Sequence, residues 1–220
     1  MTLTFNIDEN IKNILPNCRI GIVFSKVKTK DSSLDLLSKT EDVEIEFRKK
    51  LQSITESKLE VIDETRKAYK VCGKEPSRYR PSAEALLRRV RQGKGLYKIN
   101  NIVDTINLLS MTSQFSIGGF DVSKIIGSVT LDIGDANIYK AIGRGALNIE
   151  FMPGVRDEHG FFGTPTSDSV RTMVATDTSN LLLVYYDFYG NNNLESALEI
   201  ANEFLKKYCE GNSIETRIVS

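Results

Sequence analysis

The segment from Asp168 to Thr178 concentrates side chains that can bind a small polar ligand. Asp168 and Arg171 carry opposite charges, and hydroxyls follow at Thr172, Thr176 and Thr178. Residues two apart in a strand share one face, so a strand here would align the three threonines. Such hydroxyls, with backbone amides, suit an α-amino acid or the ribose end of a nucleic acid. The alternative is structural, because threonine is a good strand former.

Paired asparagines and paired glycines earlier in the chain are further candidates for ligand binding. Asn100 and Asn107 are seven residues apart, which is about two helical turns, so they can share one helix face. A buried asparagine needs hydrogen-bond partners, and a ligand can be one of them. A turn at Gly118 and Gly119 would let backbone approach a ligand closely. Helix caps and a tight turn are the structural alternatives.

One dense basic cluster follows Pro81, on a helix for which Ser82 is the predicted N-cap. Its members can contact phosphates, and such contacts weaken as salt rises. The alternative is an exposed helix face paired with acidic side chains. The cluster consists of Arg88, Arg89, Arg91, Lys94 and Lys98.

Other chemistry has weaker support. His159, the single histidine, can act as an acid or base near neutral pH, and a surface position is the alternative. One histidine with scattered carboxylates lacks metal-ligand spacing, so we predict no metal. The three cysteines form no CxxC pair and are expected to be reduced thiols of a cytoplasmic protein. No GxxxxGK loop is present, which argues against ATP, and we predict no cofactor.

Hydrophobic periodicity predicts the elements that position these side chains. A strand is expected over 19–27, and one or two helices over 34–69 that end at Gly73. A helix from Ser82 with Leu86 and Val90 toward the core precedes a helix from Asn100 or Asn101. Short strands are expected after residue 127, among them 170–178 and 181–189, with a long loop over 153–168. A last helix is expected over 193–208.

The ordered pattern from Tyr79 to Asp121 resembles the B3/B4 domain of the phenylalanyl-tRNA synthetase β-subunit, and more closely the stand-alone proteins built from that domain. Those relatives also carry a Ser-Asp-Ser…Arg-Thr…Thr pattern like that of 167–176. The matching residues of the first segment are Tyr79, Arg80, Pro81, Ser82, Glu84, Ala85, Leu86, Arg88, Arg89, Val90, Gly93, Ile99, Asn100, Val103, Asp104, Asn107, Gly118, Gly119 and Asp121.

The resemblance covers about residues 75–190 and implies an α+β fold, a three-layer α/β domain around a β-sandwich of unusual topology. We expect a single domain over 1–220, with 34–73 as a helical insertion or extension and 193–208 as a C-terminal helix. In the synthetase this domain hydrolyses tyrosine wrongly attached to the phenylalanine tRNA. A chain of this length cannot also hold the synthetase's aminoacylating parts, so we expect no ligase activity.

The resemblance implies that the chain binds tRNA or aminoacyl-tRNA and hydrolyses a mischarged ester, or descends from such a hydrolase. Asp168, Thr172 and Thr176 are then the predicted catalytic residues, with hydroxyls as donors to the oxyanion. The substrate-binding set is Asn100, Asn107, Gly118, Gly119, Arg171 and Thr178.

The alternative is a non-catalytic module that binds RNA, an amino-acid-like ligand or a protein. Lys+Arg and Asp+Glu balance at 29 each, which favours this second class slightly. No apolar run approaches the roughly 18 residues that a membrane span needs.

Overall fold

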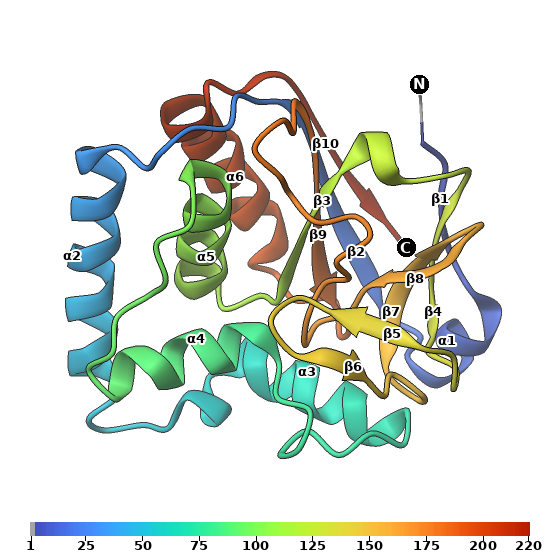
Figure 1. Ribbon diagram of the computed structural model, residues 1–220. Helices are drawn as coiled ribbons and strands as arrows, with labels where there is room; N and C mark the ends of the chain where they lie inside the picture. Colours follow the sequence, from blue (N-terminus) through green and yellow to red (C-terminus); the bar gives the residue numbers. More distant parts are fainter. Residues whose placement is uncertain (1–2) are drawn as a thin grey trace.

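Strand β9 (Asn180–Asp187) organises the fold (Figure 1). The computed structural model describes residues 3–220. Leu181, Leu183 and Tyr185 of β9 lie in one hydrophobic core. The residues between them, Leu182 and Val184, lie in a second core. The strand is apolar on both faces because it is covered on both faces.

Two four-stranded sheets form the β-sandwich. The first has the order β10 (Asn212–Val219), β2 (Arg19–Lys26), β9 and β3 (Ile117–Asp121), with antiparallel neighbours throughout. The second has the order β1 (Phe5–Ile7), β4 (Val129–Ile133), β7 (Pro153–Asp157) and β8 (Gly160–Gly163), in which β1 pairs with β4 in parallel. A small third sheet pairs β5 (Tyr139–Ala141) with β6 (Gly145–Leu147).

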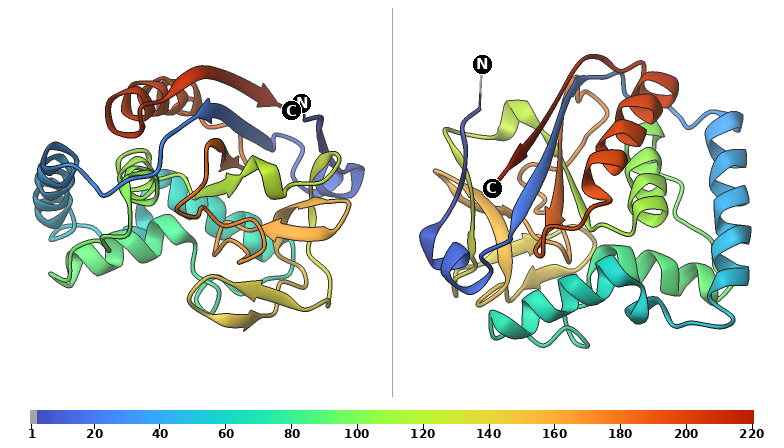
Figure 2. Two further views of the ribbon diagram at one scale, coloured as in Figure 1. Left: turned by 45° about the horizontal axis from the view of Figure 1, so that its top comes forward. Right: turned by 180° about the vertical axis from the view of Figure 1, so that it is seen from behind.

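Helices form the third layer, on the outer face of the first sheet (Figure 2). Helices α5 (Asn101–Ser113) and α6 (Leu194–Cys209) pack on each other, and α2 (Leu34–Lys50) and α4 (Ser82–Arg91) pack against α5. Gly21 lets α6 approach β2, because a Cβ there would lie 2.9 Å from Leu194 Cδ1. The remaining helices are α1 (Glu9–Ile14), α3 (Glu60–Val71) and the short η1 (Glu56–Lys58) and η2 (Val122–Lys124).

The result is the predicted α+β, three-layer arrangement, and local signals account for several of its elements. Asn100 caps α5, accepting a hydrogen bond from the Val103 N–H at 2.9 Å. Gly73 follows α3 with φ +92°, a conformation that glycine favours. Helix α6 agrees with the expected C-terminal helix within one residue at each end.

Three predictions for the β region are wrong. Residues 117–120 form most of strand β3 and are not a turn. Residues 153–163 form the β7–β8 hairpin and not a loop, because its glycines serve close packing: a Cβ on Gly154 would lie 2.6 Å from the Gly163 carbonyl oxygen. Residues 170–178 form no continuous strand, since local side-chain bonds such as Ala175 N–H to Thr178 Oγ1, 2.9 Å, compete with a ladder.

Two predictions for α4 also need correction. Ser82 is the first helical residue and Pro81 occupies the cap position, without a side-chain cap bond. Leu87, and not Leu86, faces the core together with Val90, and Leu86 is half-buried. No helix within residues 3–220 is long and apolar enough to cross a membrane.

Candidate functional site

A cavity of about 700 Å³ lies at the open edge of β3, where the helical layer meets the segment 164–174. Helices α4 and α5 form one wall, and the β5–β6 turn contributes Ile142 and Arg144 to its border. Strand β3 is the last strand of its sheet, so the backbone groups on its outer side need partners other than a neighbouring strand.

Asp168 supplies one of these partners. Its Oδ2 accepts a hydrogen bond from the Gly119 N–H at 3.0 Å, in the place of a strand carbonyl. The backbone of Asp168 is held in turn, because its carbonyl accepts from Ile142 N–H at 2.9 Å. Its other carboxylate oxygen, Oδ1, receives no hydrogen bond from any residue that the structure describes. Asp168 lines the cavity, so its carboxyl group is accessible to a ligand there.

The environment of Asp168 favours its neutral form. Burial raises the pKa of Asp168 to about 7, and the Gly119 N–H bond opposes this rise only in part. Within residues 3–220, no lysine or arginine forms an ion pair with this carboxylate. Asp168 consequently changes charge near neutral pH, which suits a general base or a partner for a ligand's ammonium group.

Apolar side chains cover much of the cavity wall. Leu86 of α4 and Val103 of α5 line it from half-buried positions, and Ile106 of α5 lines it where the cavity meets the core. Ile117 of β3 and the pair Met173 and Val174 complete this surface. Such a wall suits an aliphatic or aromatic ligand group.

Five basic side chains line the cavity, and together they are called the basic rim. Two members of the predicted basic cluster on α4, Arg88 and Arg89, line it together with Lys94. Arg91 points elsewhere and pairs with the buried Glu56, Nε to Oε2 3.2 Å. Lys98 lies outside the cavity on an exposed position. The rim also contains Arg80 and Arg144, which sequence reasoning did not single out as site residues.

Arg171 is a structural residue in this geometry. Its guanidinium donates to both carboxylate oxygens of Asp157, at 3.0 and 2.9 Å, and to the Gly160 carbonyl at 3.1 Å. Burial acts to raise the pKa of Asp157, but hydrogen bonds from Arg171 and two backbone N–H groups outweigh it and hold the pKa below its usual value. This pair ties the segment that carries Asp168 to the β7–β8 hairpin.

The three threonines do not converge as predicted, because the strand that would align them does not form. Thr172 is buried, its Oγ1 has no partner among the described residues, and it does not line the cavity. Thr176 lies exposed in a turn. Thr178 is buried and donates to Asp121 Oδ2 at 2.8 Å. None of the three threonines lines this cavity.

The predicted substrate-binding asparagines and glycines separate into two groups. Asn107 and Gly119 line the cavity. Asn100 is the α5 cap, and Gly118 lies behind the wall, where a Cβ would come within 3.1 Å of Asp168 Oδ1. The Asn107 side chain forms no hydrogen bond within the described chain, so its amide is free to bind a ligand.

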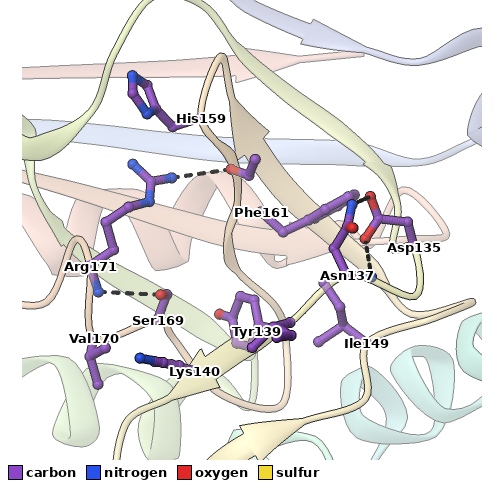
Figure 3. A pocket seen from close by; sticks show the side chains of 12 residues that line it. Asp135, Asn137, Tyr139, Lys140, Ile149, His159, Phe161, Ser169, Val170 and Arg171 are labelled. Carbon is purple, nitrogen blue, oxygen red and sulfur yellow. Dashed lines mark hydrogen bonds between the residues drawn. The ribbon is translucent and has the colours of Figure 1, made fainter.

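His159 lies at a second, smaller cavity of about 340 Å³, together with Lys140 and Arg171 (Figure 3). Asp135 and Asn137 stand on its other side. The histidine is exposed and is not part of the cavity that contains Asp168. The predicted roles of all these residues in binding or catalysis stay predictions.

The three cysteines are buried in the structure. Cys18, Cys72 and Cys209 are free and buried, and burial raises the pKa of the Cys72 and Cys209 thiols to about 11. No cluster of three or more histidine, cysteine or acidic side chains suited to a metal ion occurs within residues 3–220.

The fold and the cavity define a three-layer α+β domain with a recessed site at a sheet edge. The family model described as B3/4 domain matches residues 64–210, which is most of the chain, and the chain therefore belongs to the B3/4 domain family. A comparison with curated proteins finds no match.

A solved structure shares the fold. It is an N-terminal fragment of the phenylalanyl-tRNA synthetase β-subunit from Pyrococcus horikoshii, with a TM-score of 0.51 and 14% sequence identity. The alignment covers 100% of this chain and 55% of the fragment, so this chain spans about half the length of that protein. At this identity the likeness concerns the fold alone.

Proposed function

We propose that the cavity binds the aminoacylated 3′ end of a tRNA and that the protein hydrolyses a mischarged aminoacyl ester there. One observation carries the proposal: a carboxylate with a free oxygen and a pKa near 7 lies in an apolar cavity whose rim is basic. The apolar wall suits the amino-acid side chain, and the rim suits the phosphates that follow it. Membership of the B3/4 domain family supports this substrate class.

Asp168 is the proposed general base. The Asp168 carboxylate would accept a proton from water as the water attacks the ester carbonyl carbon, and it would return that proton to the ribose oxygen, which leaves as the hydroxyl. A pKa of about 7 lets a substantial fraction of the carboxyl groups be ionised at neutral pH, as a base requires. Asn107 and Ser82 are neutral polar side chains at the cavity that form no side-chain hydrogen bond with the rest of the described chain, and they are available to orient the substrate.

A second candidate function is binding without hydrolysis. It is favoured by the absence of Thr172 and Thr176 from the cavity, which removes the expected oxyanion donors. In this case Asp168 would pair with the ammonium group of an aminoacyl ligand and hold it. Free, buried cysteines fit a cytoplasmic location for either function.

The Asp168→Asn variant separates the two functions, because asparagine keeps the shape and the acceptor for Gly119 but cannot take a proton. If Asp168 is the base, deacylation of a tRNA mischarged with tyrosine should fall about 10²–10⁴-fold, with binding retained. If it is a binding partner only, wild-type protein should bind aminoacyl-tRNA without hydrolysing it, and the variant should bind more weakly. Asp135→Asn makes the same charge change outside this cavity and is the control.

Two lysines of one loop test the basic rim. Lys94 lines the cavity, whereas Lys98, four residues later, does not. Lys94→Ala should weaken tRNA binding and flatten the log K against log salt slope by about 0.7–0.9, the value for one lost phosphate contact. Lys98→Ala should leave both quantities unchanged. Equal effects of the two substitutions, or none from Lys94→Ala, would contradict the proposed path of the RNA over this rim.

A further inference from the structure

An aromatic side chain stands exposed at the mouth of the Asp168 cavity. Tyr97 is 57% exposed, although large apolar and aromatic residues are usually covered. It lines this cavity and also a neighbouring one of about 540 Å³ next to α2. Nothing in the core requires a tyrosine at this position.

The tyrosine ring is supported on one side by an arginine. The guanidinium carbon of Arg89 lies 3.8 Å from the centre of the Tyr97 ring, close enough for a cation–π contact. Arg89 is itself fixed, because its Nε donates to the Gly95 carbonyl at 2.5 Å. The ring therefore has a defined orientation even though much of its surface meets solvent.

The loop that carries Tyr97 is held at both ends. On one side, the Leu96 N–H donates to Glu44 Oε1 of α2 at 2.6 Å. On the other side, the Ile99 N–H donates to Asp104 Oδ1 at 2.9 Å. A ring on a held loop loses little conformational entropy when a ligand stacks on it, so this aromatic surface is preorganised.

The chemistry around the ring favours a nucleobase. Lys94 and Arg88 line the same cavity as the ring. Of the acids near the ring, Glu44 and Asp104 accept hydrogen bonds from the loop backbone, and Glu41 lines the neighbouring cavity. An exposed aromatic ring backed by arginine and flanked by cations is the arrangement by which proteins bind unpaired bases and their phosphates. Protein interfaces are depleted in lysine, so Lys94 beside the ring favours an RNA partner over a protein.

We propose that Tyr97 stacks on an unpaired base of an RNA strand whose 3′ end enters the Asp168 cavity. The inference rests on the proposed function, since it takes the same RNA as ligand. It adds a subsite for a nucleotide outside the cavity, recognised by its ring and not by its hydrogen-bonding edge. Stacking of this kind tolerates any base.

The test uses an uncharged RNA hexanucleotide that ends in CCA, and versions of it with one abasic position each. Tyr97→Ala and Tyr97→Leu should weaken binding of the intact strand roughly tenfold, whereas Tyr97→Phe should bind like wild type. One of the abasic strands should bind wild type as weakly as the intact strand binds Tyr97→Ala. For that strand, Tyr97→Ala should weaken binding no further. That loss of additivity identifies the base that stacks.

The outcomes separate this inference from the proposed function. If Tyr97→Ala binds the intact strand as wild type does, the stacking subsite is refuted, and hydrolysis at Asp168 is unaffected. If Asp168→Asn leaves deacylation unchanged while Tyr97→Ala still weakens RNA binding, the proposed function fails and the subsite stands. If wild type binds no RNA, or if Tyr97→Leu binds like wild type and only apolar bulk matters, the subsite is refuted as well.

Discussion

Asp168 shows how one hydrogen bond and burial together determine the chemistry of a side chain. The Gly119 N–H bond fixes the carboxyl group at the edge of β3, and burial raises its pKa. A carboxylate on an open surface would be ionised throughout the neutral range and would be a weak base. The reactivity of Asp168 as a base therefore depends on its recessed position as well as on its being an acidic residue.

The raised pKa of Asp168 predicts a pH-dependent stability. Between its ordinary value of 3.8 and about 7, the folded state keeps a proton that the unfolded state has released. Folding stability must therefore fall as pH rises through this window and then level off. Asp168→Asn removes the titration, so it should be more stable than wild type above pH 7, by about 1–3 kcal/mol. Urea unfolding at pH 5 and pH 8 measures the difference; a gain of equal size at both would contradict the assignment.

At the scale of single elements, each side of helix α4 contacts a different part of the molecule. Leu87 and Val90 pack in the core, Leu86 and Arg88 face the cavity, and Arg91 reaches back to Glu56. Charge clustering in the sequence correctly indicated a basic helix surface. It could not indicate which cations share a site, because that depends on how the helix is rotated against its neighbours.

The Arg171–Asp157 pair joins two segments, and we predict that its loss is costly. The Asp157 side chain is fully buried, so Arg171→Ala leaves an unpaired buried charge, with an expected cost of about 3–5 kcal/mol. The cost should shrink in acid, as Asp157 takes up a proton. Arg156→Ala is the control: its pair with Asp132 is more exposed and should contribute about 0–1 kcal/mol. Chemical denaturation compares the two variants, and equal costs would contradict this account.

The two adjacent glycines of β3 should respond differently to alanine. A Cβ on Gly118 would lie 2.4 Å from Phe120 Cζ, and that ring packs edge-on against Phe162. We expect Gly118→Ala to cost about 1–3 kcal/mol.

A Cβ on Gly119 would meet Ile106 Cδ1, also at 2.4 Å, but this atom is the mobile tip of a side chain that borders the cavity. Gly119→Ala should therefore cost less in thermal stability and should mainly reduce ligand binding. A larger loss of melting temperature for Gly119→Ala than for Gly118→Ala would contradict this ranking.

At the scale of the whole molecule, the sequence predicted the layers better than the site. Periodicity indicated β2, β9, α5 and α6, because each has a buried stripe of the right spacing. The exposed β10 and the short β1 have no such stripe and were not predicted.

The sequence predicted only some of the residues that line the cavity, because local patterns do not show which separate elements meet. Asn107, Gly119 and Asp168 do meet at one cavity, but they come from separate elements, and local patterns carry no information on such meetings. Thr172 and Thr176 do not line the cavity, because the strand that their regular spacing suggested does not form. The hydrogen bonds of the segment go instead to side chains and to the edge of β3, as in Asp121 N–H to the Thr172 carbonyl, 2.9 Å.

The two-faced strand β9 has a consequence for how the molecule unfolds. Its alternate residues belong to the core beneath the helices and to the core between the sheets, so neither core can lose its packing without disturbing the other. We expect the helical layer and the β-sandwich to melt in a single cooperative transition. The amides of β9 should then be the last to exchange with solvent deuterium, at rates that report global opening, while the exposed strand β10 exchanges earlier through local fraying.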